Sequence, residues 1–183
     1  TPNIGALTRV GSLRRMHSIY PWVSSVAWSS FMTGQNPAKH GIFGFVDRDP
    51  ATLKTYIPTA RHMLSPTLWD YLSQAGKRVV VANVPVTFPP KPVNGVLIGC
   101  FLSPSLDKTV YPESLLPTLK RLEYRVDTDP WKARASREDG MADILDALEK
   151  RVRTMFYLLE NEEWDYFMMV IMETDRLHHF YFE

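Results

Sequence analysis

Two short stretches of the 183-residue chain carry residue types that could do chemistry together. In the first, residues 20–44, Ser24 precedes a short apolar helical pattern that should end at Gly34, a residue suited to a helix C-terminus. A hydroxyl at a helix N-terminus lies where free backbone N–H groups favour an anion, so Ser24 could attack a phosphoryl group held there. From this stretch alone, the simpler interpretation is that Ser24 is a helix N-cap.

The second stretch lies near the other end of the chain. Residues 164–172 form a nearly unbroken apolar run, which is typical of a strand covered on both faces in a parallel sheet. Asp175 and His179 follow directly, and ligand chemistry in open α/β sheets gathers beyond the carboxyl ends of strands. An Asp and a His four residues apart can bind one metal ion. Alone, the pair is a weak signal, because a capping Asp beside a solvated His is commoner.

Together, the two stretches resemble the alkaline phosphatase superfamily. The nearest branch is that of the type I phosphodiesterases and nucleotide pyrophosphatases, with the related predicted phosphohydrolases and phosphomutases. The residues that carry the resemblance are Ser24, the block Thr33-Gly34-x-x-Pro37-x-x-His40-Gly41-Ile42, Asp49-Pro50, and finally Asp175 with His179. The resemblance implies that Ser24, nine residues before Thr33, is the nucleophile and contacts one of two divalent ions. It implies that Asp175 and His179 hold the other ion.

The implied reaction is hydrolysis of a phosphate ester through a covalent phospho-serine. Such a reaction needs an activated nucleophile and neutralised oxygens, and two metal ions about 4 Å apart supply both. Carboxylate and imidazole ligands suit zinc, with manganese as the alternative. One departure from the family is Phe45, which stands where nucleotide pyrophosphatases place a phosphate-binding Asn. Asn83 or Thr87 could replace that donor or simply cap a turn, so the substrate-binding residues are left unassigned. For His40 we expect a turn residue, not a metal ligand.

The elements that must position these residues alternate between helix and strand. Apolar runs predict strands over residues 79–84, 95–101 and 164–172, and a weaker pattern predicts one over 13–19. Helices are predicted after Thr1-Pro2, from Ser65-Pro66-Thr67 to Gly76, after Tyr111-Pro112 despite Pro117, and over residues 136–160. Residues 42–64 favour a loop. This order and the resemblance both predict a three-layer α/β/α sandwich with a mostly parallel sheet.

The helix over residues 136–160 has the clearest periodicity. Its predicted buried face is Met141, Ile144, Leu145, Leu148, Val152, Met155, Phe156 and Leu159. Its predicted solvated side is Glu149, Lys150, Arg151 and Arg153.

We expect residues 1–183 to be part of a single catalytic domain that is incomplete at both ends. The family's Asp after the first strand, its later Asp-His pair and its late His have no counterpart in this sequence. The chain alone is therefore expected to be inactive.

The composition limits which binding partners and which cellular compartment we expect. A net charge of +1 gives no argument for nucleic acid or an anionic membrane surface, and no apolar run is long enough to span a membrane. The single cysteine allows no internal disulfide, which favours the cytoplasm, although a missing N-terminus leaves localisation open. The expected partner is a small-molecule phosphate ester; the sequence does not predict the oligomeric state.

The leading interpretation is a metal-dependent phosphohydrolase that acts on a phosphodiester or phosphomonoester. Within the same superfamily, a phosphomutase or a sulfatase-like hydrolase is an alternative, although the residues after Ser24 lack the Pro and Arg of sulfatases. An α/β binding module without catalytic metals is the alternative from a different class.

Overall fold

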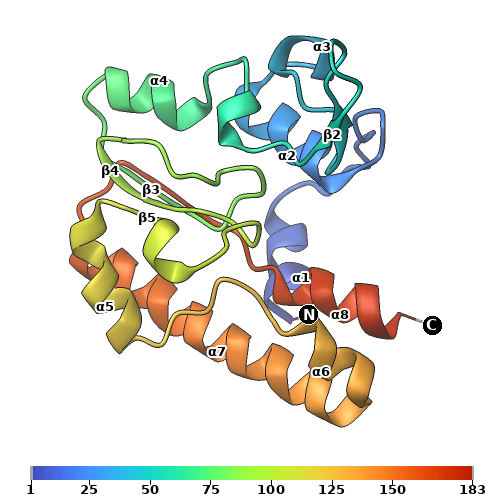
Figure 1. Cartoon of the computed structure of the whole chain (residues 1–183). Coiled ribbons are helices and arrows are strands. Elements are labelled where there is room, and N and C mark those ends of the chain that lie inside the picture. The colour runs from blue at the N-terminus through green and yellow to red at the C-terminus, as the bar shows by residue number, and fades with distance from the viewer. Residues whose placement is uncertain (1, 183) are drawn as a thin grey trace.

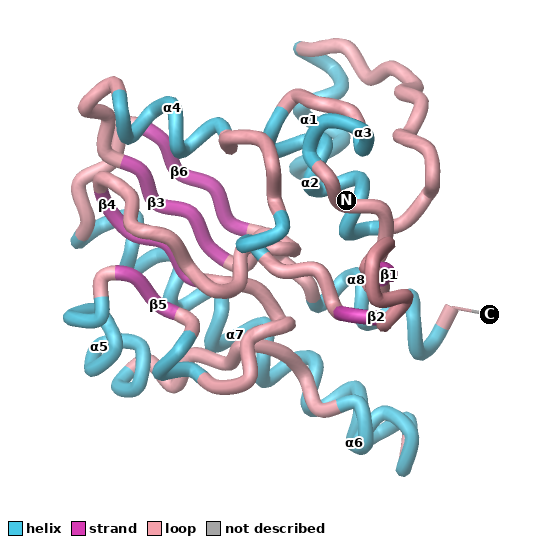
Figure 2. Tube along the Cα trace, turned by 45° about the horizontal axis from the view of Figure 1, so that its top comes forward, coloured by secondary structure: helices cyan, strands magenta, loops and turns pink. Residues whose placement is uncertain are grey.

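The computed structural model describes residues 2–182, and its centre is a four-stranded sheet in the order β5-β4-β3-β6 (Figures 1 and 2). β3 (Val79–Ala82) pairs in parallel with both β4 (Gly95–Ile98) and β6 (Tyr166–Met169). β5 (Val110–Tyr111) is antiparallel to β4. The predicted α/β fold with a mostly parallel sheet is therefore confirmed, and the three clearest predicted strands are present.

The central strand β3 explains why helices cover both faces. Successive residues of a strand point to opposite faces, and all four residues of β3 are buried. One face packs against α2 (Ser24–Thr33) and α4 (Leu68–Gln74). The opposite face packs against α5 (Leu116–Arg121) and α7 (Arg137–Asn161) (Figure 1). The complete three-layer sandwich stays a prediction.

Two further helices flank the long helix α7. α6 (Pro130–Ala135) packs on its first turns, and α8 (Glu173–Tyr181) follows β6 (Figure 1). Gly140 of α7 allows this close packing, because a Cβ there would overlap both Ala133 of α6 and the hydroxyl of Tyr181 on α8. The beginning of α7 and the end of α8 are therefore fixed against each other.

The remaining elements are short. They are α1 (Pro2–Val10), α3 (Pro37–His40), the hairpin of β1 (Asp47–Arg48) and β2 (Thr55–Tyr56), and the 3₁₀ turns η1 (Ala60–His62), η2 (Leu106–Lys108) and η3 (Glu113–Leu115). Asp49 accepts backbone hydrogen bonds in the hairpin turn, from Thr52 and Ala51, which lower its pKa. Residues 42–64 are thus mostly loop, as predicted, with the small hairpin added. The predicted helix at Pro2 is present, whereas Thr1 lies outside the described residues.

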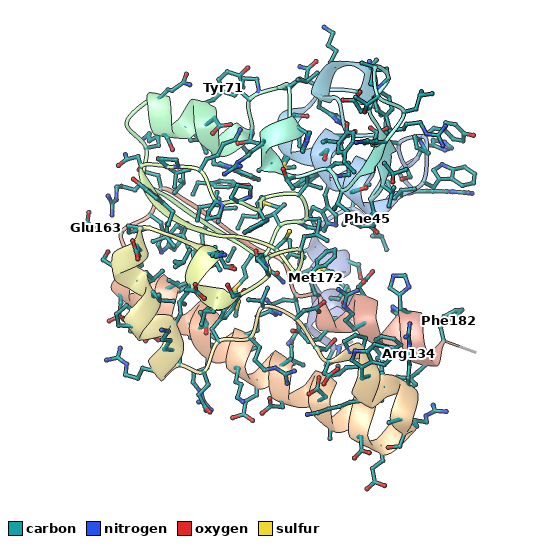
Figure 3. The ribbon with its side chains drawn as sticks, viewed as in Figure 1. Phe45, Tyr71, Arg134, Glu163, Met172 and Phe182 are labelled. Carbon is teal, nitrogen blue, oxygen red and sulfur yellow. The ribbon has the colours of Figure 1, made fainter. Side chains whose placement is uncertain are left out.

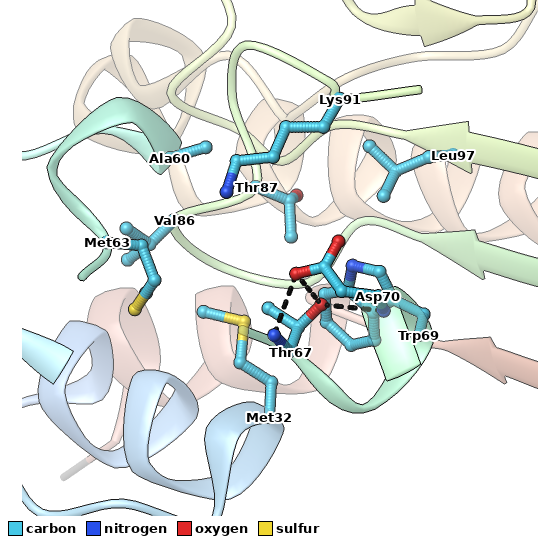
Figure 4. Close-up of a pocket in the computed structure, with 10 residues that line it drawn as sticks. All are labelled: Met32, Ala60, Met63, Thr67, Trp69, Asp70, Val86, Thr87, Lys91 and Leu97. Atoms are coloured by element: carbon cyan, nitrogen blue, oxygen red, sulfur yellow. Dashed lines mark hydrogen bonds between the residues drawn. The ribbon is translucent and has the colours of Figure 1, made fainter. Parts of the chain in front are cut away.

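Two local predictions are wrong. Residues 13–19 form no strand, and Leu13 and Met16 are exposed, because nothing in the described part of the chain pairs with this segment. The helix predicted to start at Ser65-Pro66-Thr67 instead starts at Leu68, with Thr67 as its N-cap, because Thr67 and Asp70 form a reciprocal capping box (Figure 4). The helix after Pro112 does form, as η3 and α5. Pro117 fits in the first turn of α5, where its missing N–H needs no partner.

The buried face of α7 also differs from the prediction. Leu145 and Phe156 are more than half exposed, whereas Arg151 is 1% exposed. The buried residues are Gly140, Asp143, Ile144, Ala147, Arg151, Thr154 and Leu158. Two charged side chains therefore lie where an apolar stripe was expected, and each has partners that explain its burial.

Asp143 is one of these charged residues. Its carboxylate accepts two hydrogen bonds from Arg125, one from Lys132 and one from the backbone N–H of Asp129, at 2.7 to 3.0 Å. Burial by itself raises the pKa of Asp143, but hydrogen bonds from Arg125, Asp129 and Lys132 outweigh it and lower the pKa to about 2. The segment 125–132 is thereby fixed to α7.

The low pKa makes the contribution of Asp143 depend on pH. A fall from 3.8 to about 2 corresponds to roughly 2 kcal/mol of stability, present above the unfolded-state pKa and lost as the pH falls through the folded-state pKa. Asp143→Asn should therefore lower the free energy of unfolding in urea by about 2 kcal/mol near neutral pH. Toward about pH 2 the difference from the wild type should shrink. The control Glu149→Gln, which breaks an exposed ion pair with Arg153, should change little. An equal loss for Asp143→Asn at both pH values would contradict the assignment.

Candidate active site

Ser24 is the first residue of α2. The N-cap is Val23, which has an extended backbone and makes no side-chain cap bond, so the simpler interpretation of Ser24 as an N-cap is wrong. The helix ends as predicted at Gly34, which adopts the left-handed conformation with φ of 65°. In the first turn, the N–H groups of Ser24 and Ser25 have no intrahelical carbonyl available to them. The N-terminal end of α2 therefore has backbone N–H groups available to a ligand at Ser24.

Asp175 and His179 lie one turn apart on α8, which is separated from the end of β6 by three residues. Asp175 Oδ1 lies 3.5 Å from His179 Nε2, and the two side chains are 40% and 64% exposed. The predicted position beyond the carboxyl end of a parallel strand is therefore confirmed. Their role as ligands stays a prediction.

One cavity of about 460 Å³ brings the three predicted residues together. Ser24 and Trp28 line it from α2, and Asp175, Arg176 and His179 line it from α8. Most of the remaining wall is apolar: Phe45, Val46, Ile57, Pro85, Phe101, Leu102, Val170, Ile171 and Met172. Phe45 and Met172 lie close together near the centre of Figure 3, between the α2 region and α8.

The Ser24 hydroxyl has no hydrogen-bond partner among residues 2–182. In particular, neither Asp175 nor His179 makes a hydrogen bond to it, so no general base is in place. A serine hydroxyl is a poor nucleophile unless a base or a metal ion lowers its pKa. Within the described chain, activation of Ser24 therefore has no side-chain source.

Arg176 is a cavity residue that the sequence analysis did not single out. Its guanidinium binds Asp127 through two hydrogen bonds, of 2.9 and 2.6 Å, and lies 4.8 Å from the centre of the Phe101 ring. Among the described residues that line the cavity, it is the one Lys or Arg. Its place directly after Asp175 was a signal in the sequence, but its partner Asp127 is 49 residues away.

Two other polar candidates lie elsewhere. Asn83 donates a hydrogen bond to the carbonyl of Val170, and Thr87 donates one to that of Val84. Neither lines the cavity. Both side chains therefore stabilise local backbone, and Phe45 has no polar substitute from these two positions.

His40 is fully buried in α3. Its Nδ1 accepts a hydrogen bond from the N–H of Ile42, so the neutral ring carries its proton on Nε2 and donates it to the hydroxyl of Ser30. Burial lowers the pKa of His40 and keeps it in this neutral form. Both ring nitrogens are engaged, which leaves no free ligand atom for a metal.

The Asp175 and His179 side chains fit two corners of a zinc site. Two ligand atoms bound to one tetrahedral zinc lie about 3.4 Å apart, and the observed oxygen–nitrogen distance is 3.5 Å. A catalytic zinc generally has three protein ligands, and no cluster of three or more His, Cys, Asp or Glu side chains occurs within residues 2–182. The described chain thus offers half of a coordination shell.

A sequence model described as type I phosphodiesterase / nucleotide pyrophosphatase matches residues 1–183. The chain belongs to this family. The resemblance predicted from the Ser24, Thr33-Gly34 and Asp175 motifs is confirmed, because the family lies within the alkaline phosphatase superfamily. Family membership indicates hydrolysis of small-molecule phosphoesters, of the phosphodiesterase or pyrophosphatase type. No match was found among curated proteins.

As for membranes, the helices within residues 2–182 are all too short or too polar to span one.

A buried ion pair fixes the first turn of α8, the helix that carries both candidate ligands of this phosphodiesterase-family site. Arg151 Nε lies 2.6 Å from Glu173 Oε1, and both side chains are at most 2% exposed. Arg151 also donates hydrogen bonds to the hydroxyl of Tyr124 and to the carbonyls of Arg125 and Val126. This residue was predicted to face solvent; it is buried because α8 and the segment 124–126 supply all of these acceptors.

Removing the cation should be costly. Arg151→Met leaves the Glu173 carboxylate buried without its partner, and we expect a loss of about 3–5 kcal/mol in the free energy of unfolding. The double variant Arg151→Met/Glu173→Leu removes both charges and should recover much of that loss. Arg153→Met, a neighbouring arginine whose side chain is 46% exposed, serves as the control. Equal denaturation midpoints for the Arg151 and Arg153 variants would refute the importance of the pair.

Proposed function

We propose that the chain forms the Ser24-containing part of a metal-dependent phosphohydrolase that cleaves a phosphodiester or phosphomonoester through a phospho-serine. The observation that carries the proposal is the cavity in which the first residue of α2 meets Asp175 and His179 of α8. Family membership supports the class of reaction.

In the first step, Ser24 Oγ attacks the phosphorus atom and loses its proton. The bond from phosphorus to the ester oxygen breaks, and that oxygen leaves as an alcohol after taking up a proton. A water molecule then attacks the phosphorus of phospho-Ser24 and restores the serine hydroxyl. The second product is inorganic phosphate from a monoester, or a phosphomonoester from a diester.

The residues of the cavity have separate tasks in this scheme. The N–H groups of the first turn of α2 donate to the phosphoryl oxygens, where the helix dipole also favours negative charge. Asp175 and His179 would hold one divalent ion, zinc or manganese, and Ser24 would contact a second. Bound ions supply a lower pKa for an attacking oxygen and neutralise phosphoryl charge. Such ions would require more ligands than these three side chains supply.

The apolar wall bears on the substrate. Trp28, Phe45 and Phe101 line the cavity and offer contact area for the organic group of a small ester. Phe45 donates no hydrogen bond, so the phosphoryl group depends on backbone N–H groups and metal ions for its contacts.

Ser24→Ala in the full-length gene product should abolish turnover of an activated ester such as p-nitrophenyl phosphate while zinc still binds, because Asp175 and His179 remain. The matched control is Ser25→Ala. Ser25 is the next residue of α2, is fully buried, makes no hydrogen bond through its hydroxyl, and does not line the cavity. Turnover and zinc content are measured on the same samples. Wild-type turnover by Ser24→Ala would exclude the phospho-serine.

The 183-residue chain by itself should bind zinc weakly and should not hydrolyse p-nitrophenyl phosphate. Two protein ligands are fewer than a catalytic zinc needs, and two ions need more still. Initial rates with and without added zinc, compared with those of the full-length gene product, make the test. Zinc-dependent turnover by the isolated chain would show that the ligand assignment is wrong.

A further inference from the structure

Arg176 stands between two carboxylates on the wall of the cavity. Its Nε and Nη2 bind the two oxygens of Asp127, whereas its Nη1 lies 3.6 Å from Asp175 Oδ2, beyond hydrogen-bond distance. The other oxygen, Asp175 Oδ1, faces His179. The guanidinium therefore makes both of its carboxylate hydrogen bonds to Asp127 and only a longer ion pair, without a hydrogen bond, to Asp175.

The position of Asp127 is itself well determined. Arg125, two residues earlier, binds the carboxylate of Asp143, and Arg151 donates to the carbonyls of Arg125 and Val126. Asp127 Oδ1 also accepts the N–H of Thr128. The carboxylate is thus held by its own segment, and the Arg176 guanidinium also lies over the Phe101 ring.

The charges explain why this restraint matters. If Asp127 did not hold it, the guanidinium could close the 3.6 Å gap to Asp175 Oδ2 and make a charge-assisted hydrogen bond there. Asp175 would then be unavailable to a cation. Asp127 binds Nε and Nη2 of Arg176 and so prevents Arg176 from competing with a cation for Asp175.

We propose that Asp127 is a positioning residue for the metal site: by holding Arg176, it keeps that guanidinium from hydrogen-bonding to Asp175, so that the Asp175 carboxylate can bind a divalent cation together with His179. The inference deepens the proposed function and rests on its assignment of Asp175 and His179 as ligands. It adds a residue 48 positions before Asp175 to the site, one that does not itself line the cavity.

The test is a cobalt titration of the full-length gene product, followed by visible absorbance, with zinc competition as a second readout. Asp127→Asn should weaken cobalt binding by about tenfold or more, as loss of a residue that orients a ligand does, because the released Arg176 pairs with Asp175. The double variant Asp127→Asn/Arg176→Met has no competing cation and should bind at least as tightly as the wild type. Methionine keeps an apolar stem against Phe101.

The control is Asp165→Asn, which breaks an ion pair with Lys77 at the end of β6 opposite to α8; neither residue of this pair lines the cavity. It should leave cobalt affinity unchanged. A crystal structure of Asp127→Asn should show Arg176 within hydrogen-bond distance of Asp175, which tests the competition without any metal.

The outcomes separate the inference from the proposed function. Wild-type affinity in Asp127→Asn, or an Arg176 side chain that stays in place in its crystal structure, would overturn the inference alone. A double variant as weak as Asp127→Asn would also overturn it, because the loss would then not act through Arg176. If Asp175→Asn binds cobalt as tightly as the wild type, the ligand assignment fails, and the proposed function fails with it.

Discussion

The arrangement of the cavity depends on one desolvated ion pair, Arg151 with Glu173. Removing two charges from water is expensive, and the cost is offset here because Arg151 meets the Glu173 carboxylate, the Tyr124 hydroxyl and two backbone carbonyls at once. These partners come from α8 and the segment 124–126, whereas Arg151 itself lies on α7. One arginine thus joins three parts of the chain that are distant in sequence, and it fixes the direction in which α8 leaves β6.

The two sides of α8 consequently have different tasks. Glu173 and Arg176, three residues apart, bind inward to α7 and to the segment that contains Asp127. Asp175 and His179, four residues apart, line the cavity that Ser24 enters from α2. A nine-residue helix would be a weak support on its own. Its buried salt bridges and the close contact of Tyr181 at Gly140 supply the rigidity that its length does not.

Local patterns predicted much of this fold, and long-range electrostatics account for most of what they missed. The β-branched run of β3, the Gly34 stop and the Ser24 helix start follow from short-range preferences, so sequence reasoning found them. The burial of Arg151 does not follow from short-range preferences. An arginine on a helix is expected to face solvent unless the groups that accept its hydrogen bonds are known. The role of Asp127 was missed for the same reason, because its partner Arg176 is 49 residues away. The family itself was predictable because its motif consists of small, conformationally special residues at fixed spacing.

The charge balance of the cavity wall has a consequence for the order of events. Asp127 already neutralises Arg176, and Asp175 adds a further negative charge on the side opposite Ser24. A wall of this sign repels a phosphate ester and attracts a cation. Under the proposed function, this wall would therefore favour binding of the cation before the phosphate ester, because the cation would offset the negative charge that the ester meets on the α8 side.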